Sequence, residues 1–309
     1  MSVSKRTIVL GHPRSGTTLL RRLLAGHENI VAPPETHLFG ACARFLSSEE
    51  TADGVDMGVL AGLHFSGFDD EVVIGRLRDL AFGFMDEIAT RDGASHWIEK
   101  TAFDIFHLDG IEALCDDQVR YLGIIRHPLD VAVSCTDFCS AAGLYPDTLH
   151  PYIVRYSQPI EAFVRSWIDS VEALMSLGER RPNQVMICRY EDLVAEPNET
   201  IADLLAFLGE PNDTAFLATA LSGMDNLGFS DHKSYQVDEV HQSSIHRWSA
   251  IPTAQVGRLA TLLNPYLELT GYDVLDETQA LTAAEGRNRY ARSLAVHAAQ
   301  RNVAAPDTE

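Results

Sequence analysis

The sequence predicts an α/β fold in which a central parallel sheet is flanked by helices in three layers. Apolar runs rich in β-branched residues alternate with amphipathic stretches along the chain. Strands that alternate with helices imply crossover connections, and such connections join parallel strands. The first run, "RTIVLG", leads straight into a glycine-containing turn and then into a helical pattern from about Thr17. This order of strand, turn and helix is typical of a fold that binds a phosphate group at the start of a helix.

Four strands and the helices that follow them are predicted in chain order. The strands are expected at 6–11, 96–100, 119–126 and 183–190, and the helices from about 17, after 100, at 130–138 and at 199–209. A glycine or a cationic residue stands at or just past the end of each strand, namely Gly11, Lys100, Arg126 and Arg189. Because ligands of open α/β sheets bind beyond the carboxyl ends of the strands, these four segments are expected to meet at one crevice.

Residues 1–309 are expected to form a single domain with two helical insertions. The insertions lie at about 41–94 and 142–177, where apolar residues recur at helical spacing. They are the natural places for a lid or an acceptor pocket. Residues from about 277 to 303 are rich in alanine and arginine and are expected to form a C-terminal helical tail. That tail either packs on the surface or mediates assembly, which leaves a homo-oligomer open.

The composition excludes several classes of partner. The formal net charge of -20 repels nucleic acid and anionic membranes, so an anionic ligand has to be held by a local cluster of arginines. No apolar run reaches the roughly 18 residues that a membrane span requires. The five cysteines have no spacing typical of a metal site. We therefore expect no nucleic-acid partner, no membrane span, no metal and a cytoplasmic location.

The stretch "GHPRSGTTLL" has the glycine spacing of a P-loop but lacks its lysine. Gly11 and Gly16 match the glycines of G-x-x-x-x-G-K-[ST], and Thr17 stands in the place of the lysine. Backbone N–H groups at the start of the following helix would point at an anion. The lysine serves the β- and γ-phosphates of a nucleoside triphosphate, so its absence favours a shorter anion.

A second anion site is predicted from "YLGIIRHPLDVAVS". Arg126 ends a strand in this segment, and Ser134 follows eight residues later in the next helix. An arginine fork with a nearby hydroxyl is suited to gripping a separate phosphate.

Together, "PRSGTTLL" and "RHPLDVAVS" resemble the two phosphate-binding signatures of sulfotransferases that use 3'-phosphoadenosine 5'-phosphosulfate. The resemblance implies a P-loop-like nucleotide-binding fold, the product adenosine 3',5'-bisphosphate, and no metal. It also implies that the first motif binds the 5'-phosphosulfate and that the second binds the 3'-phosphate. The residues concerned are Arg14, Ser15, Gly16, Thr17 and Thr18 in the first motif and Arg126 and Ser134 in the second.

Two later segments extend the resemblance. "CRYEDLVAEP" is similar to the strand and turn whose tyrosine, here Tyr190, lies near the adenine. "SSIHRWSAIP" is similar to the late loop that closes on the donor, in which Ser244 and Arg247 are the candidate contacts.

Sulfuryl transfer needs a base for the acceptor hydroxyl and positive charge at the departing oxygen. The resemblance implies that Glu35 in "APPETHLF" is the base, with His37 as the second candidate. It implies that Lys100 in "WIEKTAFD" reaches the leaving oxygen, and Arg14 supplies further positive charge. His246 either binds the donor or serves as an acid or base.

Three functions are compatible with these motifs. The first is a sulfotransferase whose acceptor is a hydroxylated small molecule or a carrier-bound chain, because "PPETHL" resembles the loop of bacterial sulfotransferases of polyketide assembly. The second is a P-loop kinase or nucleotide hydrolase, which Thr17 in place of lysine disfavours. The third is a non-catalytic nucleotide-binding protein, which would need neither Glu35 nor Lys100.

Overall fold

The computed structural model describes residues 4–50, 52, 54, 56–115, 117–221 and 240–277. The chain divides into two compact units, Met1–Arg247 and Trp248–Glu309. Apart from Glu277, the predicted tail at 277–303 lies outside the described residues, and the single-domain organisation stays a prediction. None of the helices in the described part of the chain is long and apolar enough to cross a membrane.

The first unit is built on a five-stranded sheet with the order β2-β5-β1-β6-β7, in which every pairing is parallel. The strands are β1 (Lys5–Leu10), β2 (Ile30–Val31), β5 (His96–Glu99), β6 (Val119–Ile125) and β7 (Val185–Arg189). Four of them match the predicted strands, so the parallel α/β sheet is confirmed. The two-residue strand β2 was not predicted, because two residues are too few to show a periodic pattern.

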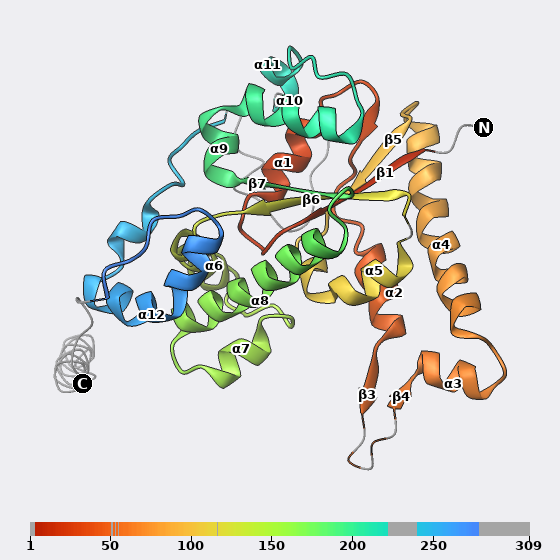
Figure 1. Ribbon diagram of the computed structural model, residues 1–309, viewed down its shortest axis with the longest axis horizontal. Coiled ribbons are helices and arrows are strands. Elements are labelled where there is room, and N and C mark those ends of the chain that lie inside the picture. The colour runs from red at the N-terminus through yellow and green to blue at the C-terminus, as the bar shows by residue number, and fades with distance from the viewer. Residues whose placement is uncertain are drawn as a thin grey trace, which may run out of the picture. The chain divides into compact units, whose positions relative to one another are not determined.

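Helices cover both faces of this sheet, which confirms the three layers (Figure 1). One face carries α1 (Thr17–Leu24), α9 (Tyr190–Ala195) and α10 (Pro197–Leu208), and the short α11 (Leu217–Ala220) follows them. The other face carries α5 (Leu108–Leu114), α6 (Pro128–Ala142) and α8 (Pro159–Arg180). The core on the first side is aliphatic, with Leu20, Leu23 and Leu204 fully buried. Burial of these apolar side chains on both faces is what holds a parallel sheet together.

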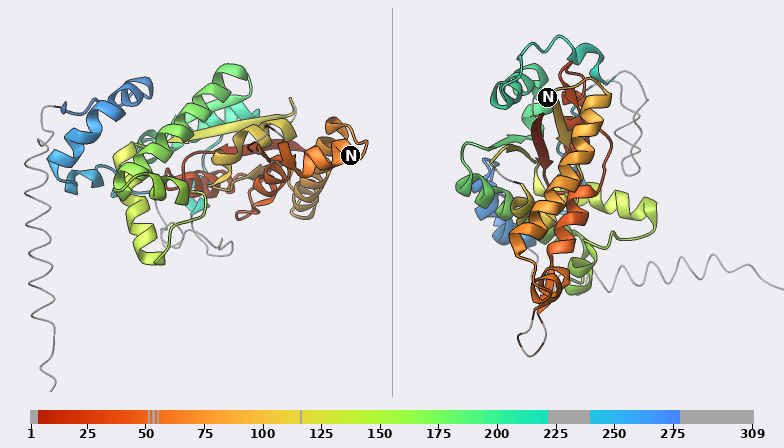
Figure 2. Two further views of the ribbon diagram at one scale, coloured as in Figure 1. Left: turned by 90° about the horizontal axis from the view of Figure 1, so that it is seen from below. Right: turned by 90° about the vertical axis from the view of Figure 1, so that its right-hand side faces the viewer.

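The 41–94 segment contains more than helices. It includes most of α2 (Leu38–Leu46), the hairpin β3 (Ser48–Glu50) and β4 (Asp56–Gly58), α3 (Val59–Phe65) and α4 (Asp70–Arg91). The hairpin was not predicted. Figures 1 and 2 show the hairpin and α3 at the end of α4 that is distant from the sheet. The other end of α4 is fixed to β5, where the ring of Phe82 packs on Trp97 and Trp97 donates a hydrogen bond of 2.7 Å to Asp86.

The 142–177 segment consists of α7 (His150–Arg155) and most of α8. The short helix η3 (Arg247–Ala250) then leads to the second unit. There, α12 (Thr253–Leu269) is tied to the chain that follows it, because the side chain of Asn264 accepts a hydrogen bond from the backbone N–H of Leu275 at 2.8 Å.

The carboxyl ends of β5, β1, β6 and β7 lie side by side at one edge of the sheet. Gly11 follows β1 there, and a Cβ at this position would lie 2.6 Å from the carbonyl oxygen of Ile124 in β6. Only glycine permits such a close approach of two backbones. Lys100 and Arg126 follow β5 and β6, the two neighbours of β1, and Arg189 ends β7, so the four predicted segments lie at one edge of the sheet. That all four line one crevice stays a prediction.

Candidate active site

The loop between β1 and α1 has the geometry of an anion-binding turn. Arg14 and Gly16 both have left-handed backbone, with φ of 74° and 99°. A side chain at Gly16 would lie 2.4 Å from the ring of Tyr190, so this position requires glycine for two reasons. The hydroxyl of Ser15 is buried without a hydrogen-bond partner among the described residues, and no described side chain caps the start of α1. The hydroxyl of Ser15 and the uncapped N–H groups of the first turn of α1 can therefore bind an anion at the amino end of the helix.

Glu35 and Lys100 form a buried ion pair beside this loop. Lys100 Nζ lies 2.5 Å from Glu35 Oε1 and donates a hydrogen bond of 3.0 Å to the hydroxyl of Thr18. The backbone N–H of Ala102 also donates to Glu35, at 3.3 Å. The side chains of Glu35 and Lys100 are only 6% and 2% exposed. The two residues are 65 positions apart in the chain, and the structure brings them together next to the phosphate loop.

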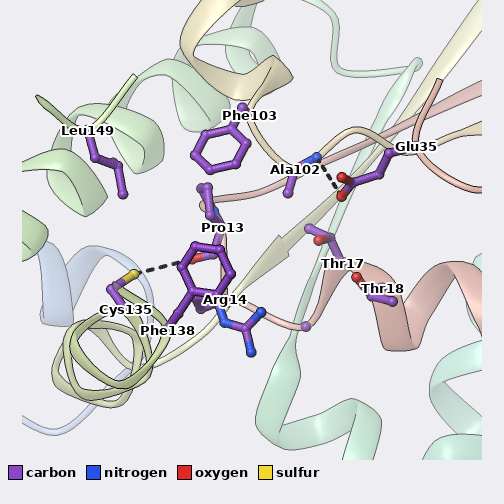
Figure 3. Close-up of a pocket in the computed structure, with 11 residues that line it drawn as sticks. Pro13, Arg14, Thr17, Thr18, Glu35, Ala102, Phe103, Cys135, Phe138 and Leu149 are labelled. Atoms are coloured by element: carbon purple, nitrogen blue, oxygen red, sulfur yellow. Dashed lines mark hydrogen bonds between the residues drawn. The ribbon is translucent and has the colours of Figure 1, made fainter. Parts of the chain in front are cut away.

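Glu35 lies at one end of a pocket whose other end is apolar. In Figure 3 the carboxylate of Glu35 lies on the same side of the pocket as Thr17 and Thr18. The side chains of Phe103, Leu149 and Phe138 lie on the opposite side. The full lining comprises Pro13, Arg14, Gly16, Thr17, Thr18, Glu35, Ala102, Phe103, Cys135, Phe138 and Leu149. The apolar members were missed from the sequence, because apolar residues in helices and turns look the same whether they line a pocket or fill a core.

A second group of side chains surrounds Arg126. Its guanidinium carbon lies 4.6 Å from the ring centroid of Tyr190, and its two terminal nitrogens donate to the backbone carbonyls of Arg14 and Ser244. Its Nε is buried without a hydrogen-bond partner in the described chain. Burial also lowers the pKa of Arg126 from its ordinary value. Neutral carbonyls do not compensate the positive charge of a buried guanidinium, so Arg126 can still bind an anion.

Two further predicted residues, Ser134 and Arg247, lie in α6 or contact it. Arg14 Nε donates a hydrogen bond of 3.2 Å to Ser134, which links the two motifs. Arg247 forms an ion pair of 2.5 Å with Asp137 of α6.

His37 and His246 both lie outside the pocket lining. His37 Nε2 is 3.9 Å from Glu35 Oε2, and its side chain is 58% exposed. His246 has a left-handed backbone with φ of 59°, and its N–H donates to the buried Asp130 at 2.9 Å.

Comparison with known proteins identifies the family. The model of the sulfotransferase family matches residues 7–214, which is more than half of the chain. The chain belongs to the sulfotransferase family. The family resemblance drawn from the two anion motifs is thereby confirmed.

Two curated relatives of this sulfotransferase chain illustrate the similarity. Nodulation protein NoeE of Sinorhizobium fredii is 27% identical over 279 residues, which cover 87% of this chain and 64% of that protein. Bovine sulfotransferase 1A1 is 27% identical over 149 residues, which cover 46% of this chain and 44% of that protein. The chain thus spans less than two thirds of the length of either relative.

Solved structures share the fold of this sulfotransferase chain. The sulfotransferase domain of the curacin biosynthetic pathway has a TM-score of 0.59 at 21% identity and covers 89% of this chain and 100% of that domain. The sulfotransferase domain of the Synechococcus olefin synthase has the same TM-score at 23% identity, with coverages of 87% and 95%. Mouse sulfotransferase SULT7A1, solved with PAP, has a TM-score of 0.52 at 14% identity over 85% of each chain.

Two further carboxyl groups that sequence reasoning missed are buried behind the Glu35–Lys100 pair. Glu99 ends β5 and Asp104 begins the short helix η1 (Asp104–His107); they are 0% and 1% exposed. Burial raises the pKa of Glu99 to about 7, and burial together with repulsion from Glu99 and Glu35 raises the pKa of Asp104 well above its ordinary value. Within the described residues, no group of three or more His, Cys, Asp or Glu side chains could hold a metal ion.

Glu99→Gln is expected to stabilise the protein at pH 8 more than at pH 4.5. Between pH 4.5 and about 7, native Glu99 keeps a proton that the unfolded chain has released, so wild-type stability falls as pH rises through this window. Glutamine removes the cost of ionising a buried carboxyl. The free energy of unfolding of the variant relative to wild type should therefore rise by about 3 kcal/mol between the two pH values. Urea unfolding at both pH values measures this, and an equal difference at both would contradict it.

Proposed function

We propose that this protein transfers a sulfuryl group from 3'-phosphoadenosine 5'-phosphosulfate to an acceptor hydroxyl, with Glu35 as the general base. The observation that carries the proposal is the Glu35–Lys100 pair, 2.5 Å apart and buried beside the phosphate loop. A base and a cation at one anion site are what in-line transfer requires. A protein that only binds nucleotides would need neither.

The donor has two anionic ends, and the site offers two anion-binding groups. The N–H groups and hydroxyls from Ser15 to Thr18, with Arg14, are suited to the 5'-phosphosulfate. Arg126 and Ser134 are suited to the 3'-phosphate. The hydrogen bond between Arg14 and Ser134 places these two groups next to each other, as one nucleotide with both anions demands.

Tyr190, Ser244 and Arg247 are proposed to complete the nucleotide site. Tyr190 packs against Gly16 and Arg126, so its ring lies between the two anion sites, and we propose that it contacts the adenine there. Ser244 contacts Arg126 through its backbone, and Arg247 is anchored on α6 by Asp137. His246 remains a candidate for donor binding or proton transfer.

In the proposed reaction, Glu35 accepts the proton of the acceptor hydroxyl while its oxygen forms a bond to sulfur. The bond between sulfur and the bridging oxygen breaks, and that oxygen keeps the electron pair as part of the 5'-phosphate. Lys100, which contacts both Glu35 and Thr18, is placed to neutralise the charge on the departing oxygen. Arg14 adds positive charge at the same loop.

We propose that the acceptor is a hydroxylated small molecule or a carrier-bound acyl chain. Phe103, Phe138 and Leu149 give the pocket an apolar wall beyond the carboxylate of Glu35, which suits a hydroxyl carried on an apolar skeleton. The five cysteines are free thiols, which supports a cytoplasmic location. A homo-oligomer stays a prediction.

Adenosine 3',5'-bisphosphate is expected to raise the melting temperature far more than ATP with magnesium does. At a hundredfold excess over its dissociation constant, the bisphosphate should stabilise the fold by about 2.7 kcal/mol. Thr17 provides no ammonium group for a triphosphate, so ATP should have only a small effect. Thermal unfolding with each nucleotide tests this. Equal or greater stabilisation by ATP would favour a kinase or hydrolase instead.

The transfer itself is tested by incubating the protein with the sulfate donor and 2-naphthol, 1-octanol or methyl glucoside. Mass spectrometry then detects sulfation of a phenol, an alcohol or a sugar. We expect sulfation of the apolar probes, since the wall of the pocket is apolar.

A further inference from the structure

We propose that Glu99 is a positioning residue that holds the loop carrying Glu35 at the end of β5. The proposal rests on Glu35 being the base, as proposed above. Glu99 itself does not line the pocket, so its effect on the reaction would pass through Glu35.

The loop at 32–37 has no regular secondary structure, so hydrogen bonds to its neighbours have to fix its path. At its start, the buried Arg21 of α1 donates a hydrogen bond of 2.5 Å to the carbonyl of Ala32. At its end, His37 has a left-handed backbone with φ of 56°. A non-glycine residue keeps this conformation only where its surroundings hold it.

Glu99 and Thr101 supply the bonds that hold this end. The N–H of Thr36 donates to Glu99 Oε1 at 3.4 Å, and the N–H of His37 donates to the hydroxyl of Thr101 at 3.2 Å. That hydroxyl donates in turn to the same Glu99 Oε1 at 2.7 Å. The two backbone amides that directly follow Glu35 are therefore tied, one directly and one through Thr101, to a single carboxylate oxygen.

The same short segment also holds the carboxylate of Glu35. Lys100 lies between Glu99 and Thr101 in the chain and contacts Glu35 at 2.5 Å. The backbone of the loop and the side chain of Glu35 are thus fixed by three consecutive residues. Loss of the Glu99 acceptor would free the loop while leaving Lys100 in place, and a displacement of about 1 Å at a reacting group costs up to roughly a hundredfold in rate.

The stability of the fold by itself does not favour a glutamate at position 99. It is fully buried, and its Oε2 has no hydrogen-bond partner in the part of the chain that the structure describes. Among charged and titratable groups, Lys100 from the end of β5 and Asp104 from η1 interact with Glu99. Glu35 from the loop and Arg44 from α2 interact with Asp104. An apolar residue would avoid the free-energy cost of burying a carboxyl group here. We therefore infer that the role of Glu99 is to provide the oxygen that accepts hydrogen bonds from Thr36 and Thr101.

The test removes the connecting hydroxyl without changing the shape of the core. Thr101→Val eliminates the bonds to Glu99 and from His37 and keeps the branched side chain. The matched control is Thr7→Val, which removes another fully buried hydroxyl, bonded to His96 at 2.8 Å at the opposite end of β5. Glu99→Gln keeps an acceptor oxygen, whereas Glu99→Leu removes it.

Turnover is measured with the most reactive of the three acceptor probes, and affinity for adenosine 3',5'-bisphosphate is measured by calorimetry. We expect Thr101→Val and Glu99→Leu to lower kcat by roughly ten- to a hundredfold, with the affinity for the bisphosphate changed less than about twofold. Glu99→Gln should retain most of the turnover, and Thr7→Val should leave kcat unchanged.

A double variant separates positioning from a general structural role. In the Glu35→Gln background, Thr101→Val should lower kcat no further, because the loop no longer presents a base. If Thr101→Val lowers kcat by the same factor with and without Glu35, the positioning role is wrong although Glu35 remains the base. If Glu35→Gln alone leaves turnover intact, the base assignment itself fails. If Glu99→Leu folds and keeps full turnover, the proposal is overturned directly.

Discussion

Replacing Glu35 by glutamine is expected to lower turnover by roughly a hundredfold to ten-thousandfold, the range for loss of a positioned general base. Glutamine keeps the size of the side chain and its acceptor oxygen but cannot take a proton from the acceptor hydroxyl. Affinity for adenosine 3',5'-bisphosphate should barely change, since the loop amides and Arg126 are untouched. Calorimetry for the nucleotide and a turnover assay with the reactive probe measure the two effects.

Glu210→Gln is the matched control for this experiment. Glu210 is likewise a buried glutamate paired with a lysine, 2.8 Å from Lys5 Nζ, and it lies outside the pocket lining. Its replacement should reduce stability and leave turnover as it is. A Glu35→Gln protein with near-full turnover would remove Glu35 from the mechanism. His37, 3.9 Å away, and His246 would then be the bases to test.

Arg126→Ala is expected to weaken binding of adenosine 3',5'-bisphosphate by roughly 2 to 4 kcal/mol, through the loss of a charge-assisted contact to the 3'-phosphate. The guanidinium is held over Tyr190 by two backbone carbonyls, so it is oriented before the ligand arrives. Adenosine 5'-phosphosulfate has no 3'-phosphate, and its binding should suffer much less. Titration calorimetry with both nucleotides gives the two values.

The control for this change is Arg120→Ala in β6, the strand that Arg126 follows. Arg120 also lies near an aromatic ring, 5.4 Å from the centroid of Phe207, and donates to a backbone carbonyl, but it stands near the amino end of β6. It should affect stability and not nucleotide binding. Equal weakening of both nucleotides by Arg126→Ala would mean that Arg126 supports the loop and does not select the 3'-phosphate.

The sequence alone was sufficient to predict the alternation of strands and helices and to locate the two anion motifs. Four apolar runs, each followed by a helical pattern, determine a parallel sheet, because their burial requires helices on both faces. Gly11, Gly16 and Arg126 are local signals: a tight turn needs glycine, and an arginine at a strand end can reach an anion. The β3–β4 hairpin and β2 escaped prediction because their strands are two or three residues long.

The tertiary structure alone decided which distant residues meet. Glu35 and Lys100 are brought to 2.5 Å because β2, which precedes the Glu35 loop, pairs with β5, which precedes Lys100. In the chain, α2, the β3–β4 hairpin, α3 and α4 lie between these two strands. The pocket wall of Phe103, Phe138 and Leu149 comes from three different segments, and no local pattern separates such residues from core. Glu99 looks like any strand-end carboxylate in the sequence. Its burial and its bonds to the Glu35 loop exist only when β5, the loop and η1 pack together, since burial and hydrogen-bond partners are properties of the packed chain and not of the residue.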